Sequence, residues 1–379
     1  MFSTYLRSLK FLILLSGITI SSLGVRAEDQ ARNNIILTTD SILSAGYSQG
    51  RLIRDTISPH ISEEIVLNSN PDSLARINML LNKEADACFC GPVAYMAQEG
   101  LSGFDDRTAG PQPVRLLLSS SSAFAMTFAL GEDIKNTDLS SLKGKRVAWL
   151  RKDHQFNFHT TALLAYAGLN WQNVQQVVFP DYKSTLEGFE RNYVDALLVL
   201  SSDTSLQKLL EGKRKLKLAA FSAANKTAWK RVQSLAPYLS PQTSPQANGI
   251  PAIEGVTYAY PNLISASTLS TEKAYKLTRN IVEQFDNFAG DSTAAEGWNI
   301  LFQNFFGSIP FHDGSVQYFK ELNIWSDEAE QHRNKLLSRQ KYLMQVFEQL
   351  QLNEDTDQDF PLTWRNAREA ALIARESSE

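Results

Sequence analysis

The segment LKGKRVAWLRKDHQFNFHTTALLAYAG, Leu142–Gly168, carries the pattern that decides the fold. A basic turn leads into the short apolar run Val147–Leu150, which is typical of a buried strand. A polar loop follows, and apolar residues then recur at helical spacing up to Gly168, a residue type that often ends a helix. The segment therefore predicts one strand that leads directly into one helix.

The junction between this strand and this helix offers a place for a small anion. The first N–H groups of an α-helix have no intrahelical partner, and the positive end of the helix dipole lies beside them. We therefore expect the loop 151–156 to be able to bind an anion such as a carboxylate.

The length of the chain indicates more than one hydrophobic core. The sequence has 379 residues, of which 43% are apolar and 21% are charged. Single cores stop growing at roughly 250–300 residues. We therefore expect two lobes.

The first 27 residues have the order of a secretory signal peptide. Arg7 and Lys10 precede the apolar run 11–20, and Val25-Arg26-Ala27 supplies a cleavage site with small residues. The apolar run is shorter than the ~20 residues that a transmembrane helix needs. The sequence thus predicts an exported, periplasmic protein. Loss of three basic residues with the peptide changes the net charge from −4 to −7, so nucleic acid is not an expected partner.

The two cysteines, Cys88 and Cys90, are separated by one residue in the apolar run Ala87–Cys90. On a strand both side chains would face the same side, and a disulfide between them would be strained. No second cysteine pair and no nearby histidine completes a metal site. We expect both cysteines to pack in the core.

Short apolar runs alternate with helical patterns in both halves of the chain. The first half is expected to contain strands at 34–39, 65–67 and 87–90, with helices after the first two of them. The second half repeats this order, with strands at 145–150, 174–179 and 195–200 and helices at 156–167 and 184–191. Ser184 and Glu187 have the spacing of a capping box at the start of the last helix. The pattern predicts two α/β lobes, each with a mostly parallel sheet flanked by helices.

An aspartate occupies the same place in both halves. Asp86 and Asp195 each follow a helix exit and stand at the start of an apolar strand. Because the surrounding order of elements is also repeated, we expect the two lobes to be built alike.

Two segments are expected to connect the lobes. They are Val114–Leu118, with the serines that follow it, and Val256–Ile264. The segment 234–253, rich in Pro, Ser and Gln, indicates a surface loop, and the chain after residue 271 has helical patterns, among them 298–305. The expected division is a signal peptide at 1–27, a first lobe at 28–122 and 258–325, a second lobe at 123–257, and a helical C-terminal extension on the first lobe at 326–379.

Ligands of open α/β sheets bind outside the carboxyl ends of the strands. The loops there would surround one cleft that closes by hinge motion. Arg76, on the first turn of its helix, could bind a carboxylate through two hydrogen bonds, although a solvated arginine is the alternative. Phe156 and Tyr182 could stack on a ligand or pack in the core. The candidate ligand-binding residues are Tyr47, Ser48, Ser73, Arg76, Gly91, Pro92, Arg151, His154, Gln155, Phe156, Tyr182, Ser201, Tyr260 and Asn262.

A catalytic or metal site could be sought at Asp153, His154 and His159. The two histidines are five residues apart and would point to different helix faces, and no nucleophile stands beside them at a suggestive spacing. The sequence also lacks the glycine-rich, nucleophile-elbow and zinc-helix signatures of the common cofactor enzymes and hydrolases. We therefore expect a binding protein with no catalytic residues, no metal and no cofactor.

Several short stretches have an order known from one family of binding proteins. They are the loop with Tyr47 and Gly50, then Leu80–Cys90, Leu142–Val147, Ala167–Leu169, Tyr260–Asn262, Ile309–His312, Tyr318–Glu321 and Ile324–Trp325. In this the chain resembles the TAXI-type (TRAP-associated extracytoplasmic immunogenic) solute-binding proteins of TRAP transporters. The resemblance implies a two-lobed periplasmic binding protein of type II-like fold. It also implies capture of a small organic acid, often glutamate or 2-oxoglutarate, and delivery to the membrane subunits. We expect a monomer.

The chain departs from that family's pattern in the loops of the cleft. Asn70-Pro71-Asp72-Ser73 replaces a Thr-Gly-Gly-Ser turn, Arg76 replaces an asparagine, and Asp153-His154-Gln155-Phe156 replaces a loop of the Gly-Ser-Gly-Thr type. Glycines in such loops let backbone N–H groups surround a carboxylate closely. The replacements predict a bulkier, more aromatic wall and a ligand other than the family's usual one.

Three other functions stay open at this point. The protein could be a periplasmic ligand sensor that docks on a membrane kinase or cyclase. It could be a periplasmic enzyme that uses Asp153 and His154. It could also be an assembly module that acts through its helical C-terminus without a ligand.

Overall fold

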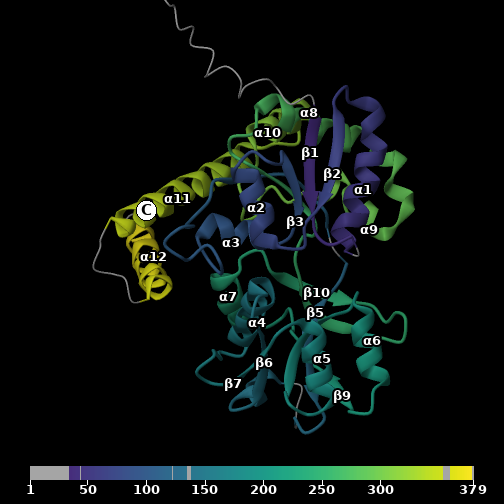
Figure 1. Ribbon diagram of the computed structural model, residues 1–379, viewed down its shortest axis with the longest axis vertical. Helices are drawn as coiled ribbons and strands as arrows, with labels where there is room; N and C mark the ends of the chain where they lie inside the picture. The colour runs from purple at the N-terminus through teal and green to yellow at the C-terminus, as the bar shows by residue number, and fades with distance from the viewer. Residues whose placement is uncertain (1–33, 43, 122, 135–137, 353–358, 378–379) are drawn as a thin grey trace, which may run out of the picture. The chain divides into compact units, whose positions relative to one another are not determined.

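The computed structural model describes residues 34–377 except 43, 122, 135–137 and 353–358 (Figure 1). The predicted signal peptide, residues 1–27, lies outside these residues. In the described part of the chain, two sheets each have flanking helices (Figure 1).

The first lobe is built on a five-stranded sheet in the order β2-β1-β3-β12-β4. Its strands are β1 (Asn34–Thr39), β2 (Glu64–Ser69), β3 (Ala87–Cys90), β4 (Val114–Ser119) and β12 (Asn262–Ala266). Its helices are α1 (Ala45–Ile57), α2 (Ser73–Leu81), α3 (Val93–Glu99), α8 (Thr271–Glu283), α9 (Thr293–Glu296) and α10 (Asp313–Glu321). β12 reaches this sheet only after the chain has passed through the second lobe, and it is antiparallel to both β3 and β4.

The second lobe is built on a seven-stranded sheet in the order β10-β11-β5-β8-β6-β7, with β9 paired to β5. Its strands are β5 (Met126–Gly131), β6 (Arg146–Leu150), β7 (Gln175–Phe179), β8 (Ala196–Leu200), β9 (Leu216–Leu218), β10 (Ser240–Ser244) and β11 (Ile253–Thr257). Its helices are α4 (His154–Tyr166), α5 (Tyr182–Glu190), α6 (Thr204–Glu211) and α7 (Lys226–Leu235). β6, β7 and β8 run parallel, as the repeated β-α-β pattern predicts.

The two sheets with their flanking helices confirm the expected α/β class with two lobes, but neither sheet is mostly parallel as predicted. Both sheets are mixed. The β-α-β strands are parallel, whereas β12 in the first lobe and β5 in the second run antiparallel to their neighbours because they belong to the segments that connect the lobes. The predicted strand and helix of the opening segment are β6 and α4, and Gly168 follows the helix with a φ of +71°, a backbone conformation that favours glycine.

Two local predictions were wrong. The segment 234–253 contains the strand β10, which is an edge strand of serine, proline, glutamine and threonine and so lacks an apolar pattern. The segment 298–305 is not an α-helix and contains only the 3-10 turn Ile300–Phe302. Its leucine and two phenylalanines are exposed or half-buried, so apolar composition there did not indicate a helix.

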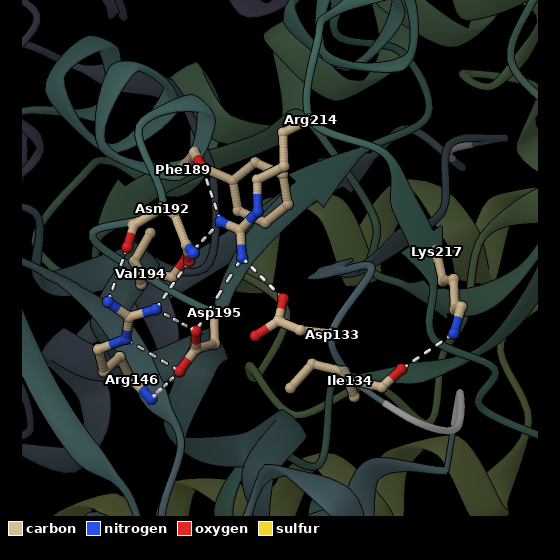
Figure 2. Close-up of polar contacts among 9 residues, drawn as sticks. All are labelled: Asp133, Ile134, Arg146, Phe189, Asn192, Val194, Asp195, Arg214 and Lys217. Atoms are coloured by element: carbon tan, nitrogen blue, oxygen red, sulfur yellow. Dashed lines mark hydrogen bonds and ion pairs between the residues drawn. The ribbon is translucent and has the colours of Figure 1, made fainter.

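The two repeated aspartates have the same role in both lobes. Asp195, directly before β8, accepts hydrogen bonds from the backbone N–H and the side chain of Arg146 at the start of β6 (Figure 2). Burial alone would raise the pKa of Asp195, but the hydrogen bonds from Arg146 hold it below the usual value. Asp86, directly before β3, likewise accepts the N–H of Ile36 in β1 at 2.8 Å. Each aspartate therefore links two parallel strands by hydrogen bonds at the amino ends of those strands.

Cys88 and Cys90 are fully buried in the core of the first lobe, as expected. The structure also joins them by a disulfide, which the sequence analysis disfavoured. Because alternate residues of β3 share one face, their Cα atoms are only 5.3 Å apart, within the range that disulfides span.

The C-terminal extension consists of α11 (Asp327–Gln351) and α12 (Phe360–Glu376), drawn in yellow in Figure 1. Glu99, at the end of α3, is 1% exposed and accepts hydrogen bonds from Arg339 of α11 and Arg368 of α12. The indole N–H of Trp364 donates to the carbonyl of Gly100 at 2.6 Å. The extension thus packs on the first lobe, as predicted.

Candidate functional site

A cleft of about 580 Å³ lies at the carboxyl ends of the strands, between loops of the two lobes. The first lobe contributes Asp40, which directly follows β1, and residues 71–74 and Arg76 at the start of α2. The second lobe contributes residues 152–155 at the start of α4. The structure therefore brings together four residues that the sequence predicted for one ligand site, namely Ser73, Arg76, His154 and Gln155.

Arg76 is the most deeply buried charged side chain of this cleft, with 3% of its surface exposed. Its Nη1 atom donates a hydrogen bond to the carbonyl of Asn70 and lies 3.5 Å from the Oδ1 atom of Asp40. Its Nε atom hydrogen-bonds to no described residue. A buried donor normally has a partner, so the guanidinium is fixed in place with hydrogen-bonding capacity left over.

One of the first N–H groups of α4, which the sequence predicted to be open to a ligand anion, is hydrogen-bonded within the chain. Asp153 is the N-cap residue, and its carboxylate accepts the N–H of Phe156 at 2.9 Å. Surrounding protein raises the pKa of Asp153, although the side chain remains in contact with solvent, and the charge of Asp40 raises it further. The position expected to hold a ligand carboxylate is therefore occupied by the chain's own.

The same device recurs at other helices that begin at the carboxyl ends of strands. Asp72 caps α2, Asp181 caps α5 and Asp203 caps α6, each through its side-chain oxygen. For α5 this corrects the predicted capping box, because Ser184 lies inside the helix and its N–H donates to Asp181. The signal for these caps was present in the sequence, since aspartate is a favoured residue directly before a helix.

Tyr260 and Gln155 close the inner side of the site against two glycines. A Cβ atom on Gly46, at the start of α1, would lie 2.7 Å from the hydroxyl of Tyr260. A Cβ atom on Gly91 would lie 3.4 Å from both Tyr260 and the Oε1 atom of Gln155. Gln155 also donates to the hydroxyl of Tyr258 at 3.3 Å. Residues of the second lobe and of a connecting segment thus reach the backbone of the first lobe.

Burial raises the pKa of Tyr260, and the neighbouring charge of Asp40 raises it further. Tyr260 is therefore a neutral hydrogen-bonding group at physiological pH. Neither Asp40 nor Tyr258 was a candidate from the sequence, because their neighbours come from distant parts of the chain.

Two predicted residues, Pro92 and Asn262, line a different cavity of about 420 Å³. The rings of Tyr95, Tyr238 and Tyr258 also border it. Its described lining residues are all uncharged. It shares no residue with the cleft at Arg76, so the predicted set is divided between two places.

The remaining predicted residues do not line the cleft. Ser201 accepts the N–H of Ala125 at 2.9 Å, and Ser48 donates to the carbonyl of Ser44. Phe156 packs against Tyr182 with ring centroids 6.0 Å apart, in the core of the second lobe. Arg151 is exposed and Tyr47 is half-buried. A ligand role for these six residues stays a prediction.

His159 is buried on the far side of α4 from His154, with 2% of its surface exposed. Its Nε2 atom lies 3.1 Å from the hydroxyl of Tyr238, and burial lowers its pKa to about 3. It is therefore a neutral core residue at physiological pH. In the ranges that the structure describes, no group of three or more His, Cys, Asp or Glu side chains could hold a metal ion.

The low pKa of His159 makes stability depend on pH. Between about pH 6.5 and 3 the unfolded chain binds a proton at this histidine and the folded chain does not, so the free energy of unfolding should fall as pH falls. We expect this residue to contribute a slope of up to about 1.4 kcal/mol per pH unit in urea unfolding. His159→Gln should lose that contribution, whereas His60→Gln, at an exposed site, should keep it. An unchanged slope in His159→Gln would show that the buried, neutral state is wrong.

Comparison with known proteins identifies the family. A model of the NMT1-like family matches residues 45–322. The chain belongs to the NMT1-like family. The matched region of this NMT1-like protein includes Arg76 and the loop 151–156 and ends before α11. A search of curated protein sequences gave no significant match.

Solved structures with a similar course of the chain are distant. The periplasmic aliphatic sulphonate binding protein SsuA from Escherichia coli is 12% identical with a TM-score of 0.47, over 90% of this chain and 88% of that one. The P235GK mutant of ArgBP from T. maritima is 11% identical with a TM-score of 0.40, over 72% and 97%. AbpA from Streptococcus pneumoniae, bound to L-arginine, is 13% identical with a TM-score of 0.38, over 70% and 92%. Likenesses this distant carry no information on the ligand of the NMT1-like chain.

Among the described residues, none of the helices combines the length and the apolar composition needed to cross a bilayer.

Proposed function

We propose that this NMT1-like protein is the periplasmic solute-binding subunit of a TRAP transporter of the TAXI type. In this proposal it captures a small organic acid between its lobes and delivers the solute to membrane subunits. The single observation that supports it best is the buried guanidinium of Arg76, which lines a cleft of about 580 Å³ together with polar groups of the other lobe. Arginine is suited to carboxylates because its planar donors match both carboxylate oxygens.

The arrangement of the cleft supports reversible capture. Because Arg76 and Gln155 belong to different lobes, a solute that contacts both would be held best when the lobes are close together. Gln155 already lies within van der Waals distance of the position that a side chain on Gly91 would take. The two lobes already come this close at the inner side of the cleft. Hinge closure could therefore bury a small solute with no additional loop or helix as a lid.

The proposal favours binding over catalysis. A catalytic nucleophile needs an adjacent base, and the base in turn needs a group that orients it. At the cleft, the carboxylate of Asp153 caps α4. His159 lies outside the cleft, with its Nε2 atom beside the hydroxyl of Tyr238. The side chains that a catalytic interpretation would use, Asp153 and His159, thus already have structural partners.

The test of this function is uptake by cells. A deletion strain should lose accumulation of the labelled solute, and the wild-type gene should restore it. We expect Arg76→Ala to fail in this complementation although the protein is exported, and Arg51→Ala, at an exposed position of α1, to succeed. If deletion leaves uptake unchanged but alters transcription in response to the solute, the protein is a sensor and the proposal is wrong.

A further inference from the structure

The charges around the cleft do not fit a solute that is only an acid. Its lining contains three carboxylates, those of Asp40, Asp72 and Asp153, but only two permanent cations, Arg76 and Lys152. The imidazole of His154 also lines the cleft. Lys152 is exposed, so its charge is well screened by water. Arg76 is buried but already lies 3.5 Å from Asp40. A solute with two or three carboxylates would therefore meet net negative charge.

The helix ends cannot supply the missing positive potential. On α2 the carboxylate of Asp72 accepts two of the first N–H groups, and on α4 the carboxylate of Asp153 accepts one. A ligand anion placed at either end would have to displace that carboxylate or approach it closely. Arg76 is therefore the one buried cation among the residues lining the cleft that a ligand carboxylate can use.

A separate observation points to a bound ligand beside Arg76. The Nε atom of this side chain is buried and has no hydrogen-bond partner among the described residues. Guanidinium groups bind carboxylates through two parallel N–H donors, of which Nε is commonly one. One carboxylate of a solute would thus complete the hydrogen bonding of Arg76.

Asp40 of the first lobe and Asp153 of the second line the same cleft, so their like charges repel each other. The charge of Asp40 contributes to the raised pKa of Asp153 and also to that of Tyr260. The other charged or titratable groups that line the cleft are Arg76 of α2, Lys152 just before α4, and His154, the first residue of α4. A positively charged group of the solute, placed between the carboxylates of Asp40 and Asp153, would remove this repulsion. The carboxylate of the same solute would still bind Arg76.

We infer that the solute is a zwitterion, whose carboxylate binds Arg76 and whose ammonium or other basic nitrogen lies between Asp40 and Asp153. This inference rests on the proposed function, since it concerns the same cleft, and it narrows the ligand from organic acids in general to acids with a basic nitrogen. A dicarboxylate such as 2-oxoglutarate is then a poor ligand.

The experiment uses pairs of ligands in which one member lacks either the basic nitrogen or the carboxylate. Binding to the full mature protein would be measured by calorimetry with L-glutamate and 2-oxoglutarate, L-leucine and 4-methyl-2-oxopentanoate, and L-arginine and agmatine, which lacks the carboxylate. We expect the best ligand to carry both groups and to bind at least 10-fold more tightly than its partner. In addition, any solute retained through purification would be identified by its mass after denaturation, and we expect it to contain a basic nitrogen and a carboxylate.

A variant that removes one negative charge from the cleft tests whether that charge attracts or repels the solute. Asp153→Asn removes the charge but can still cap α4, because asparagine is as good an N-cap residue as aspartate. It should weaken binding of the zwitterion at least 10-fold, and Asp181→Asn, which makes the same change at the cap of α5 outside the cleft, should not. If Asp153→Asn strengthens binding, or if the oxo acids bind as well as the amino acids, the solute is a plain anion and the inference is wrong while the proposed function stands. If no member of either class binds and no solute is retained, the proposed function fails, and the inference fails with it.

Discussion

Arg76→Ala is expected to lower the affinity for the solute at least ~100-fold. A hydrogen bond to a charged group contributes about 1.5–3 kcal/mol, and a factor of ten in affinity corresponds to about 1.4 kcal/mol. Loss of a two-pronged contact therefore reaches the ~100-fold level, and the variant also leaves Asp40 without its ion-pair partner. Calorimetric titration of the solute into the purified variant would measure the loss.

Two further variants separate charge from geometry at this position. Arg76→Lys keeps the positive charge but not the planar pair of donors, so its affinity should lie between those of the wild type and Arg76→Ala. Arg51→Ala removes an exposed arginine from the neighbouring helix α1 and should leave the affinity unchanged. Wild-type affinity in Arg76→Ala, with an intact fold by circular dichroism, would contradict the assignment of the cleft.

Glu99→Ala is expected to lower the free energy of unfolding by about 3–5 kcal/mol. Removing one partner of a buried ion pair has a cost of this size, because the other charge stays buried without compensation. Glu99 accepts hydrogen bonds from both Arg339 and Arg368, so the change affects the attachment of α11 and α12 together. Chemical unfolding followed by circular dichroism would measure it.

An exposed ion pair provides the matched control for Glu99. Glu283→Ala removes the partner of Arg279 on the surface of α8, where water screens the charges and such pairs contribute little. The effect of Glu99→Ala on the free energy of unfolding should therefore be much larger than that of Glu283→Ala. An equally small effect of Glu99→Ala would mean that the extension does not depend on this contact.

The contribution of Glu99 also depends on pH. Burial alone would raise its pKa, but the two arginines hold it below the usual value. A carboxyl group with a lowered pKa stabilises the folded state fully above its unfolded pKa of about 4.3 and progressively less as pH falls through the folded pKa. The difference between wild type and Glu99→Ala should accordingly shrink in acid.

The sequence predicted the framework of the lobes well because the framework depends on local patterns. The apolar runs at 34–39 and 87–90 are β1 and β3 with the expected bounds. The repeated aspartates, Asp86 and Asp195, do stand in the same structural place, and each ties down a neighbouring parallel strand. These features are visible in the sequence since periodicity, turn residues and position before a strand all lie within a few residues.

The site was predicted only in part because its contacts join distant segments. Arg76 was a candidate from its place at a helix start, but Asp40 follows β1 and acquires its role only through Arg76 and Asp153. The close approach of Tyr260 to Gly46 likewise depends on how a connecting segment returns to the first lobe. The anion site expected at 151–156 stays a prediction, and the residue that accepts one of the first N–H groups of α4, Asp153, is part of the quoted segment itself.

The family assignment and the cleft limit the possible functions of the protein, but they do not identify the solute. Membership of the NMT1-like family covers the two lobes up to residue 322. The resemblance to TAXI-type proteins, the TRAP membrane partners and the organic acid remain proposals. They share one requirement, which is that a small molecule with a carboxylate occupies the cleft at Arg76.

Native mass spectrometry of the freshly purified mature protein tests that requirement most directly. We expect a species heavier than the chain by one small solute, whose mass after release identifies a carboxylic acid, and we expect Arg76→Ala to be found without it while Arg51→Ala retains it. A protein that carries no solute and gains none from periplasmic extract, or that retains the same solute in Arg76→Ala, would contradict the account.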